Sequence, residues 1–232
     1  MEILRFKPII KNMEDALKAH YSSSARRIES VELIHLPFCL FNYDVVRRRW
    51  FSSEISDKAL LLVDMVNGIP INVPSQVEFE DSGGAVAPLL SGIDRSRATR
   101  IAGRGLKMRV SRIAVEKADV EERSAIKPLL NDEEAIRRGL WALRYDLMRV
   151  WGPLRYRSIK LAKSDKDAVT MHFPYWMLYY RKAGRMHFDA LDALSGVREG
   201  TQIKMSIVKG MSSEGQDGGG SPPTVFALLP EA

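Results

Sequence analysis

Cysteine is almost absent from this chain, because Cys39 is the only one among 232 residues. An intramolecular disulfide is therefore excluded, and an unpaired thiol in an apolar segment is typical of a reducing compartment. Its apolar neighbours predict that Cys39 is a small buried side chain rather than a nucleophile.

Long apolar runs are missing as well. No stretch approaches the roughly 20 apolar residues that a helix needs to cross a bilayer, and the first residues, MEILRFKPIIKN, contain no signal-peptide core. We therefore expect a cytoplasmic protein with no transmembrane segment, and peripheral contact with a membrane stays open. Apolar residues make up 45% and charged residues 28% of the chain, which is typical of a soluble globular protein with a real core.

Recognisable catalytic and metal-binding patterns are also lacking. The sequence has no Gly-x-Ser-x-Gly motif and no Cys/His spacing that would supply the three or four ligands of a metal site. Of its four histidines, His35 and His172 occupy equivalent positions of a repeated phrase, and we expect both to make structural hydrogen bonds. The sequence therefore predicts no catalytic residue, no metal and no cofactor, and favours a non-enzymatic protein. An enzyme whose site is assembled from residues far apart in the chain stays open.

Acidic residues are absent from one long basic stretch, Arg95 to Arg112, which holds seven Lys or Arg residues within a net charge of +6. Such a stretch is usually a solvated loop or strand face, but it also suits an anionic partner such as nucleic acid. The triplet Arg47–Arg49 lies beside Trp50 and Phe51, and arginine next to aromatic rings suits base stacking or a membrane interface. The candidate residues for nucleic-acid or anion binding are Arg95, Arg97, Arg100, Arg104, Lys107, Arg47, Arg48 and Arg49.

A phrase that occurs twice is the main positive feature. ELIHLPFCLFNY at 32–43 and TMHFPYWMLYYR at 170–181 both place His, one residue, Pro and an aromatic before a long apolar stretch. Each is followed by a second apolar segment that ends in Asp-x-x-Asn/Ser-Gly, at Asp64–Gly68 and Asp192–Gly196. The His-to-Asp spacing is 29 residues in the first copy and 20 in the second, so we expect the extra residues in RRRWFSSEISDK at 47–58.

A helix is expected before each phrase. Asn12 can cap one that runs to about Arg27, and Asn131 can cap a stronger one in which Ile136, Leu140, Leu143, Leu147 and Val150 form an apolar stripe. The sequence thus predicts an α+β fold of two helix–β-hairpin repeats around an antiparallel sheet, with an irregular middle segment. The expected units are residues 1–75 (first repeat), 76–130 (basic middle segment), 131–211 (second repeat) and 212–232 (flexible tail with a short apolar motif).

The second hairpin carries large apolar groups on both faces if Ala183-Gly184 is a two-residue turn. One face holds Tyr175, Met177 and Tyr179, and the opposite face holds Trp176, Leu178 and Tyr180. One face should pack on the amphipathic helix. The other must be covered by the rest of the chain or by another molecule, because large exposed apolar patches mark contacts.

The order of helix, strand, hairpin and a closing VDMVNG or LDALSG resembles PepSY-type modules, over about 12–70 and 131–200. Both copies lack the Thr that usually precedes the Gly of the module's closing turn. The resemblance implies a small α+β binding or regulatory module rather than an enzyme.

The C-terminus adds a second indication of a partner. SSEGQDGGGSPP has the composition of a flexible linker, and it precedes the apolar segment TVFALL, which could add to a sheet edge. The leading hypothesis is a protein-interaction or scaffold subunit, with a protein partner or self-association into an oligomer. A nucleic-acid-associated protein is the alternative. The candidate protein-binding residues are Trp176, Leu178, Tyr180, Val225, Phe226 and Leu228.

Overall fold

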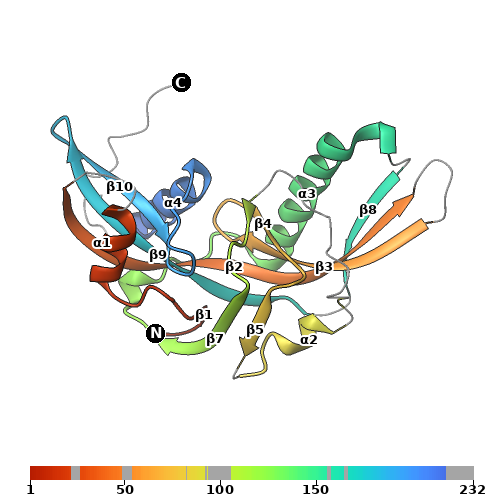
Figure 1. The fold of residues 1–232 in the computed structure, drawn as a ribbon, viewed down its shortest axis with the longest axis horizontal. Coiled ribbons are helices and arrows are strands. Elements are labelled where there is room, and N and C mark those ends of the chain that lie inside the picture. Colours follow the sequence, from red (N-terminus) through yellow and green to blue (C-terminus); the bar gives the residue numbers. More distant parts are fainter. Residues whose placement is uncertain are drawn as a thin grey trace.

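The computed structural model describes residues 1–21, 27–48, 54–81, 83–91, 93, 106–155, 158–164 and 167–217. The described strands form one large, mostly antiparallel sheet that is accompanied by helices, so the fold is α+β (Figure 1). The strands are β1 (Glu2–Phe6), β2 (Ile28–Arg48), β3 (Glu54–Asp64), β4 (Pro70–Val73), β5 (Glu78–Asp81), β6 (Leu106–Lys107), β7 (Arg112–Asp119), β8 (Ser158–Lys163), β9 (Val169–Lys182) and β10 (Arg185–Asp192). The helices are α1 (Met13–Tyr21), α2 (Ala87–Leu90), α3 (Asp132–Arg155), α4 (Thr201–Asp217) and a 3-10 turn, η1 (Glu122–Ser124).

The sheet runs in the order β5-β7-β1-β9-β2-β3-β4-β6, with β10 added to β9 and β8 added to β2. Its centre is the antiparallel pair of the two repeated phrases. His35 lies opposite Pro174 and Pro37 lies opposite His172, so the two His-x-Pro segments face each other in reciprocal register. Neither proline interrupts the pairing of β2 with β9, which continues on both sides of the four residues.

Side chains alternate between the two faces of these central strands, and both faces are buried. On one face, Leu36, Phe38 and Phe173 belong to a large cluster that also contains Ile203 and Ile207 of α4. The other face is divided between two helices. α3 covers side chains of β2 and β3, and α1 covers side chains of β9 and β10.

Each helix therefore packs on the hairpin of the other half of the chain. The expectation that the amphipathic helix at 131–150 packs on the second hairpin is wrong. Backbone hydrogen bonds explain why each helix packs on the opposite half. The N–H groups of Leu129 and Leu130 donate to the carbonyl of Met65, whereas those of Ile9 and Ile10 donate to the carbonyl of Ala193. The start of each helix is thus fixed to the closing turn of the opposite half.

The two closing turns have matching geometry. In the first, the carboxylate of Asp64 accepts from the N–H groups of Val66 and Asn67, and in the second Asp192 accepts from those of Leu194 and Ser195. Gly68 and Gly196 have φ angles of 79° and 71°, which glycine adopts without strain. The Asp-x-x-Asn/Ser-Gly pattern therefore corresponds to a side-chain-capped turn in both places.

The second hairpin agrees with its prediction. Ala183 and Gly184 both have positive φ, as a type I′ turn requires, and Lys182 pairs with Arg185. Trp176 pairs with Leu191 and Leu178 pairs with Asp189, so these four side chains share one face of the hairpin.

Other elements differ from expectation. The composition of RRRWFSSEISDK at 47–58 predicts a long polar turn, but β2 reaches Arg48 and β3 begins at Glu54, so the described residues of this segment are paired strand. α1 is described from Met13 to Tyr21, and residues 22–26, over which the helix was expected to continue, lie outside the described residues. The middle segment is less irregular than expected, since β5 pairs with β7 and β7 pairs with β1. The paired strands are distant in sequence, so no local pattern predicts which strands pair. α4 continues to Asp217 and so includes residues for which the composition predicts a flexible linker.

α3 packs closely on the sheet at Gly139. A Cβ atom there would lie 2.2 Å from Cγ2 of Val63. We therefore expect Gly139→Ala to lower the free energy of unfolding by about 1–3 kcal/mol, despite the better helix propensity of alanine. Urea denaturation followed by circular dichroism would measure the change.

The companion variant Gly139→Ala/Val63→Ala removes the methyl groups that the new Cβ meets. If crowding is the cause, Val63→Ala should destabilise the Gly139→Ala protein less than it destabilises the wild type. Additive effects of the two substitutions would contradict a direct contact.

Candidate functional site

The solvent side of α3 has an unusual composition. Between residues 137 and 149, every exposed side chain is either arginine or a large apolar group, and the one acidic residue, Asp146, is partly buried. We call this set the outer face, and it consists of Arg137, Arg138, Trp141, Arg144, Tyr145, Met148 and Arg149. A water-facing helix surface normally carries mixed charges of both signs. The outer face is therefore the strongest candidate for a binding surface among the described residues.

The opposite side of α3 holds the helix in place. Ala135, Leu143 and Leu147 are buried against β2 and β3. Asn131 caps the helix, because its side-chain oxygen accepts from the N–H of Glu134 at 2.9 Å. Since the inner side is packed and the N-terminus is capped, the outer face lies on a rigid support.

Two aromatic rings lie at the centre of the outer face. The rings of Trp141 and Tyr145 stack with centroids 6.1 Å apart and planes inclined by 14°. Trp141 is 71% exposed and Tyr145 is 59% exposed, and Met148, one turn further on, is 44% exposed. Leaving such groups in water forgoes roughly 1.5–3 kcal/mol each relative to full burial, so their exposure calls for an explanation.

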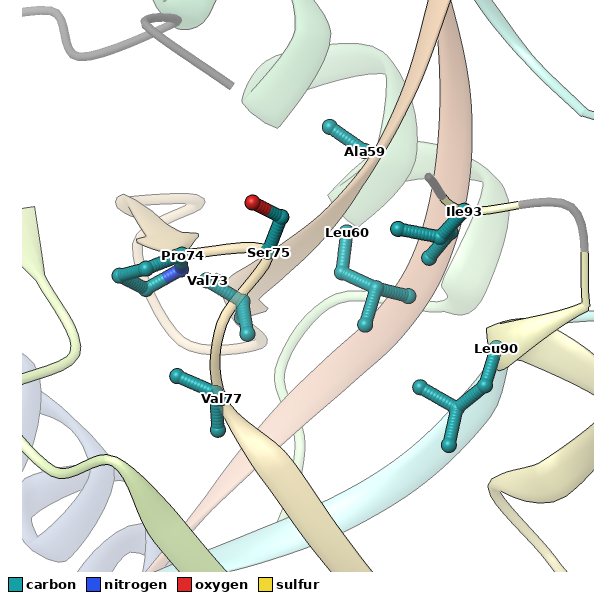
Figure 2. Close-up of a pocket in the computed structure, with 8 residues that line it drawn as sticks. All are labelled: Ala59, Leu60, Val73, Pro74, Ser75, Val77, Leu90 and Ile93. Carbon is teal, nitrogen blue, oxygen red and sulfur yellow. The ribbon is translucent and has the colours of Figure 1, made fainter. Parts of the chain in front are cut away.

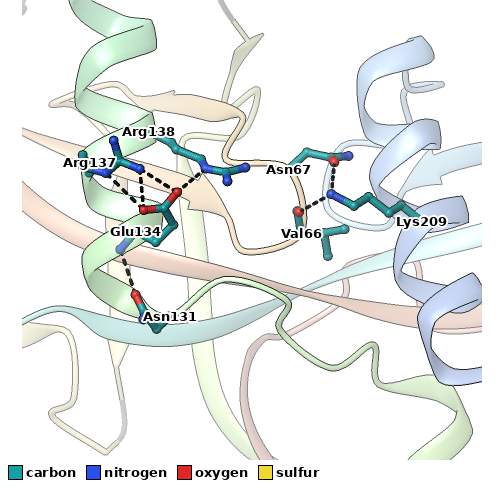
Figure 3. A network of polar contacts seen from close by, with 7 residues as sticks. All are labelled: Val66, Asn67, Asn131, Glu134, Arg137, Arg138 and Lys209. Atoms are coloured by element: carbon teal, nitrogen blue, oxygen red, sulfur yellow. Dashed lines mark hydrogen bonds and ion pairs between the residues drawn. The ribbon is translucent and has the colours of Figure 1, made fainter. Parts of the chain in front are cut away.

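Charge on the outer face is entirely positive. Glu134, at the beginning of the helix, accepts hydrogen bonds from Arg137 and Arg138, and these bonds lower the pKa of its carboxyl (Figure 3). Arg144 and Arg149 make no ion pair with any described residue. The C-terminal half of the outer face therefore presents two guanidinium groups to solvent.

Figure 3 also shows how the first closing turn is held between two helices. A Cβ atom on Gly68 would lie 2.8 Å from the side chain of Arg138, so the turn touches α3 closely. On its other side Lys209 of α4 donates to Asn67 Oδ1 at 3.1 Å and to the carbonyl of Val66 at 3.3 Å. Of the outer face, these contacts involve only Arg138, and Trp141, Tyr145 and Met148 stay exposed.

Buried carboxyl groups form a second set of candidates. Burial raises the pKa of Asp64 and of Asp192, although each accepts several hydrogen bonds. Ser206 of α4 donates to Asp64 at 2.5 Å, and the hydroxyl of Ser195 donates to Asp192 at the same distance. Both carboxyls thus serve as acceptors that shape the closing turns.

The cavity beside Asp192 is too small for a substrate. Its lining includes Arg109, Tyr175, Asp192 and Glu199, and its volume is about 20 Å³, enough for about one water molecule. Burial raises the pKa of Glu199, and the neighbouring Asp192 raises it further. A second cavity, of about 10 Å³, lies between β3, the segment after β4 and the end of α2 (Figure 2). Among its lining residues Ser75 alone has a polar side chain, and the others are apolar.

The two repeat histidines lie near each other at the centre of the sheet. Arg5 Nη1 donates to His35 Nε2 at 2.9 Å, and the Nδ1 of His35 lies 3.3 Å from the carbonyl of Ser124. Burial lowers the pKa of both His35 and His172. Among the described residues, no group of three or more His, Cys, Asp or Glu side chains is arranged to hold a metal ion.

The predicted protein-binding residues of the second hairpin are covered by the chain itself. Trp176 and Leu178 are buried in the cluster that includes Ala16 of α1, and the indole of Trp176 donates to the carbonyl of Ile10. Tyr180 is buried too. Of the two covers that the sequence left open, the first half of the chain is the one observed. Val225, Phe226 and Leu228 lie outside the described residues.

The predicted basic residues are mostly outside the described part of the chain. This applies to Arg95, Arg97, Arg100, Arg104 and Arg49. Lys107 lies in β6, where only its backbone is described. Arg47 is paired with Asp57 of β3, and Arg48 is exposed at the end of β2.

Sequence reasoning missed the aromatic centre of the outer face. The signal was present, because Trp141, Tyr145 and Met148 fall outside the apolar stripe that faces the sheet. Such large apolar side chains on the wrong side of an amphipathic helix indicate a contact surface.

No helix in the described part of the chain has both the length and the apolar character that crossing a bilayer demands. Comparisons with protein-family models, with curated proteins and with solved structures gave no match.

Proposed function

We propose that this chain is a non-enzymatic interaction subunit that docks on a protein partner through the outer face of α3. The observation that carries the proposal is the exposed stack of Trp141 on Tyr145, set among arginines on a rigid helix. Trp, Tyr, Arg and Met are the residue types enriched at protein–protein interfaces, and Trp, Tyr and Arg dominate their binding energy.

The proposed docking surface replaces the strand faces as the leading site, because those faces are buried within the chain. The apolar tail segment with Val225, Phe226 and Leu228 remains a second proposed contact. A nucleic-acid partner is the other hypothesis for a face with four arginines and two stacked rings, and the experiment below separates the two classes.

We also infer that the two halves are degenerate copies of one unit. The reciprocal register of the two His-x-Pro segments, the matching turns at Asp64 and Asp192, and the exchange of helices between halves all support this inference. Counting from the capping asparagines, Trp141 and Tyr145 correspond to Ser22 and Arg26. The outer face would then be a specialisation of the second copy.

The test is site-specific photo-crosslinking in cells that naturally make the protein. Met148 is replaced by p-benzoylphenylalanine, and a matched protein carries the same residue at Lys182, which is exposed at the end of β9. We expect an adduct at position 148 and not at 182, sensitive to protease and resistant to nuclease. Trp141→Ala/Tyr145→Ala in the Met148-substituted protein should abolish the adduct.

An adduct that nuclease removes would indicate that the partner is a nucleic acid and not a protein. Adducts of the same pattern at both positions, or none at position 148, would contradict docking through α3. Because the three substituted side chains of α3 are exposed, we expect the substitutions to change the free energy of unfolding by no more than about 0.5 kcal/mol.

A further inference from the structure

The apolar groups of the outer face are spaced for one particular kind of occupant. Trp141, Tyr145 and Met148 follow one another at steps of four and three residues. This is the spacing at which one helix lines up a narrow seam against a second helix, since two turns bring the side chains back to the same side. The exposed seam is the outer counterpart of the buried stripe that faces the sheet.

The arginines occupy the positions that border such a seam. Arg137 and Arg144 lie along one side of it and Arg149 along the other, as the geometry of a 3.6-residue helix requires. In paired helices, side chains at these bordering positions form the ion pairs that select the partner and its orientation. A partner whose own border is acidic would therefore be preferred over one whose border is basic.

We propose that the occupant of the outer face is a single amphipathic helix of another protein, with an apolar seam bordered by Glu or Asp. This inference rests on the proposed function and names the chemistry of its partner. A second copy of this chain is disfavoured, because a symmetric contact through α3 would set arginines against arginines. A nucleic acid would gain stacking from the two rings but nothing specific from Met148, and single strands are usually held in a basic groove rather than on a convex helix.

The test uses two synthetic helical peptides with the same leucine seam. One carries Glu at the bordering positions and the other carries Lys, and each is labelled and titrated with the full chain by fluorescence anisotropy. We expect the Glu peptide to bind at least about tenfold more tightly than the Lys peptide. Trp141→Ala/Tyr145→Ala should weaken the Glu peptide by about 30-fold or more.

Charge reversal supplies the specific control. Arg144→Glu/Arg149→Glu changes two exposed arginines with no ion pair to a described residue, and should shift the preference toward the Lys peptide. Lys182→Glu, on the exposed end of β9, should leave both affinities unchanged. Circular dichroism spectra would verify that each variant is folded.

The outcomes separate the two proposals. If the Glu peptide fails to bind, or both peptides bind equally, the acidic-helix partner is overturned. If the crosslink at position 148 then persists, docking through α3 stands with a partner of another kind. Binding of a single-stranded oligonucleotide or of phosphatidylserine vesicles in place of the peptide, lost in Trp141→Ala/Tyr145→Ala, would assign the outer face to nucleic acid or to a membrane surface instead.

Discussion

Replacing Asp189 with asparagine is expected to lower the free energy of unfolding by about 3 kcal/mol. The carboxylate of Asp189 is 1% exposed, and it accepts hydrogen bonds from Arg198 Nη2 at 2.6 Å and from Lys204 Nζ at 2.8 Å. His20 of α1, fully buried, lies 3.3 Å away through Nε2. Asparagine keeps the shape but removes the charge. This loss of stability is at the lower end of the range for breaking a buried ion pair, because the side chains of Arg198 and Lys204 are also partly exposed to water.

The pKa of Asp189 supports the importance of these contacts. Burial by itself would raise this pKa, yet hydrogen bonds from Lys204 and Arg198 hold it at about 2. The contribution of the carboxylate is therefore present at neutral pH and is lost only as pH falls from the unfolded value near 3.8 through the folded pKa.

Urea denaturation at pH 7 measures the effect, and Glu121→Gln is the matched control. Glu121 pairs with Arg123 at 2.7 Å, but both side chains are largely exposed. Its loss should change the free energy of unfolding by less than about 0.5 kcal/mol. If Asp189→Asn behaved like this control, the Asp189 contacts would not hold α1, β10 and α4 together.

Features that depend on neighbouring residues could be predicted from the sequence. The type I′ turn at Ala183-Gly184, the amphipathic stripe of α3 and its Asn131 cap need only local spacing and turn chemistry. The closing turns at Asp64 and Asp192 belong to the same class, because one carboxylate and one glycine determine each of them.

The arrangement of helices on the sheet could not be predicted in the same way. Either hairpin offered an apolar face to α3, and the choice was decided by the pairing of β2 with β9 and by the bonds from Leu129 and Leu130 to Met65. These are long-range contacts that leave no periodic signal in either segment.

The sequence also contains a stronger sign of a repeat, a Lys-Pro pair before each helix. Lys7-Pro8 and Lys127-Pro128 precede the two helices, each followed by two aliphatic residues. Phe6 and Ile126, just before these pairs, are both buried in the same large cluster. Alignment on these residues would have extended the expected repeat to the segments that join each helix to the opposite turn.

The sequence of α4 predicts a helix only weakly, although the helix is present in the structure. Ile203, Ile207 and Met211 recur at four-residue steps, which is a helical pattern. Gly210, Gly215 and three serines lower the helix propensity of α4. The glycine has a packing reason, since a Cβ atom there would lie 2.3 Å from Cγ2 of Ile126. Tertiary contact thus overrides the local preference.

The difference between local signals and long-range contacts also explains why the sequence predicted the candidate site only in part. Arginine and aromatic residues on α3 were visible in the sequence, but their exposure depends on which side of the helix the sheet covers. Conversely, Trp176 and Leu178 suggested a contact surface until α1 was placed on them. Burial, which decides between core and surface for any apolar residue, is set by the whole fold.

The second large effect expected is a fall in stability between neutral and mildly acidic pH that depends on His35. Burial, and after it the guanidinium of Arg5, lower the pKa of His35 from 6.5 to about 4, although the Ser124 carbonyl opposes the change. In the unfolded chain the ring takes up a proton near pH 6.5, whereas the folded protein resists protonation until about pH 4. The free energy of unfolding should therefore fall by about 3 kcal/mol over this range from His35 alone.

The comparison of wild type with His35→Gln isolates this contribution. Asp64, Asp192 and Glu199 have raised pKa values and so change stability in the opposite direction as pH falls, but they do so in both proteins. Free energies of unfolding from urea titrations at several pH values between 7 and 4 should show the wild type losing about 3 kcal/mol relative to the variant. Parallel curves for the two proteins would mean that His35 is not held neutral beside Arg5. A steeper fall in the wild type would tie the centre of the sheet, where the two His-x-Pro segments pair, to the acid sensitivity of the whole fold.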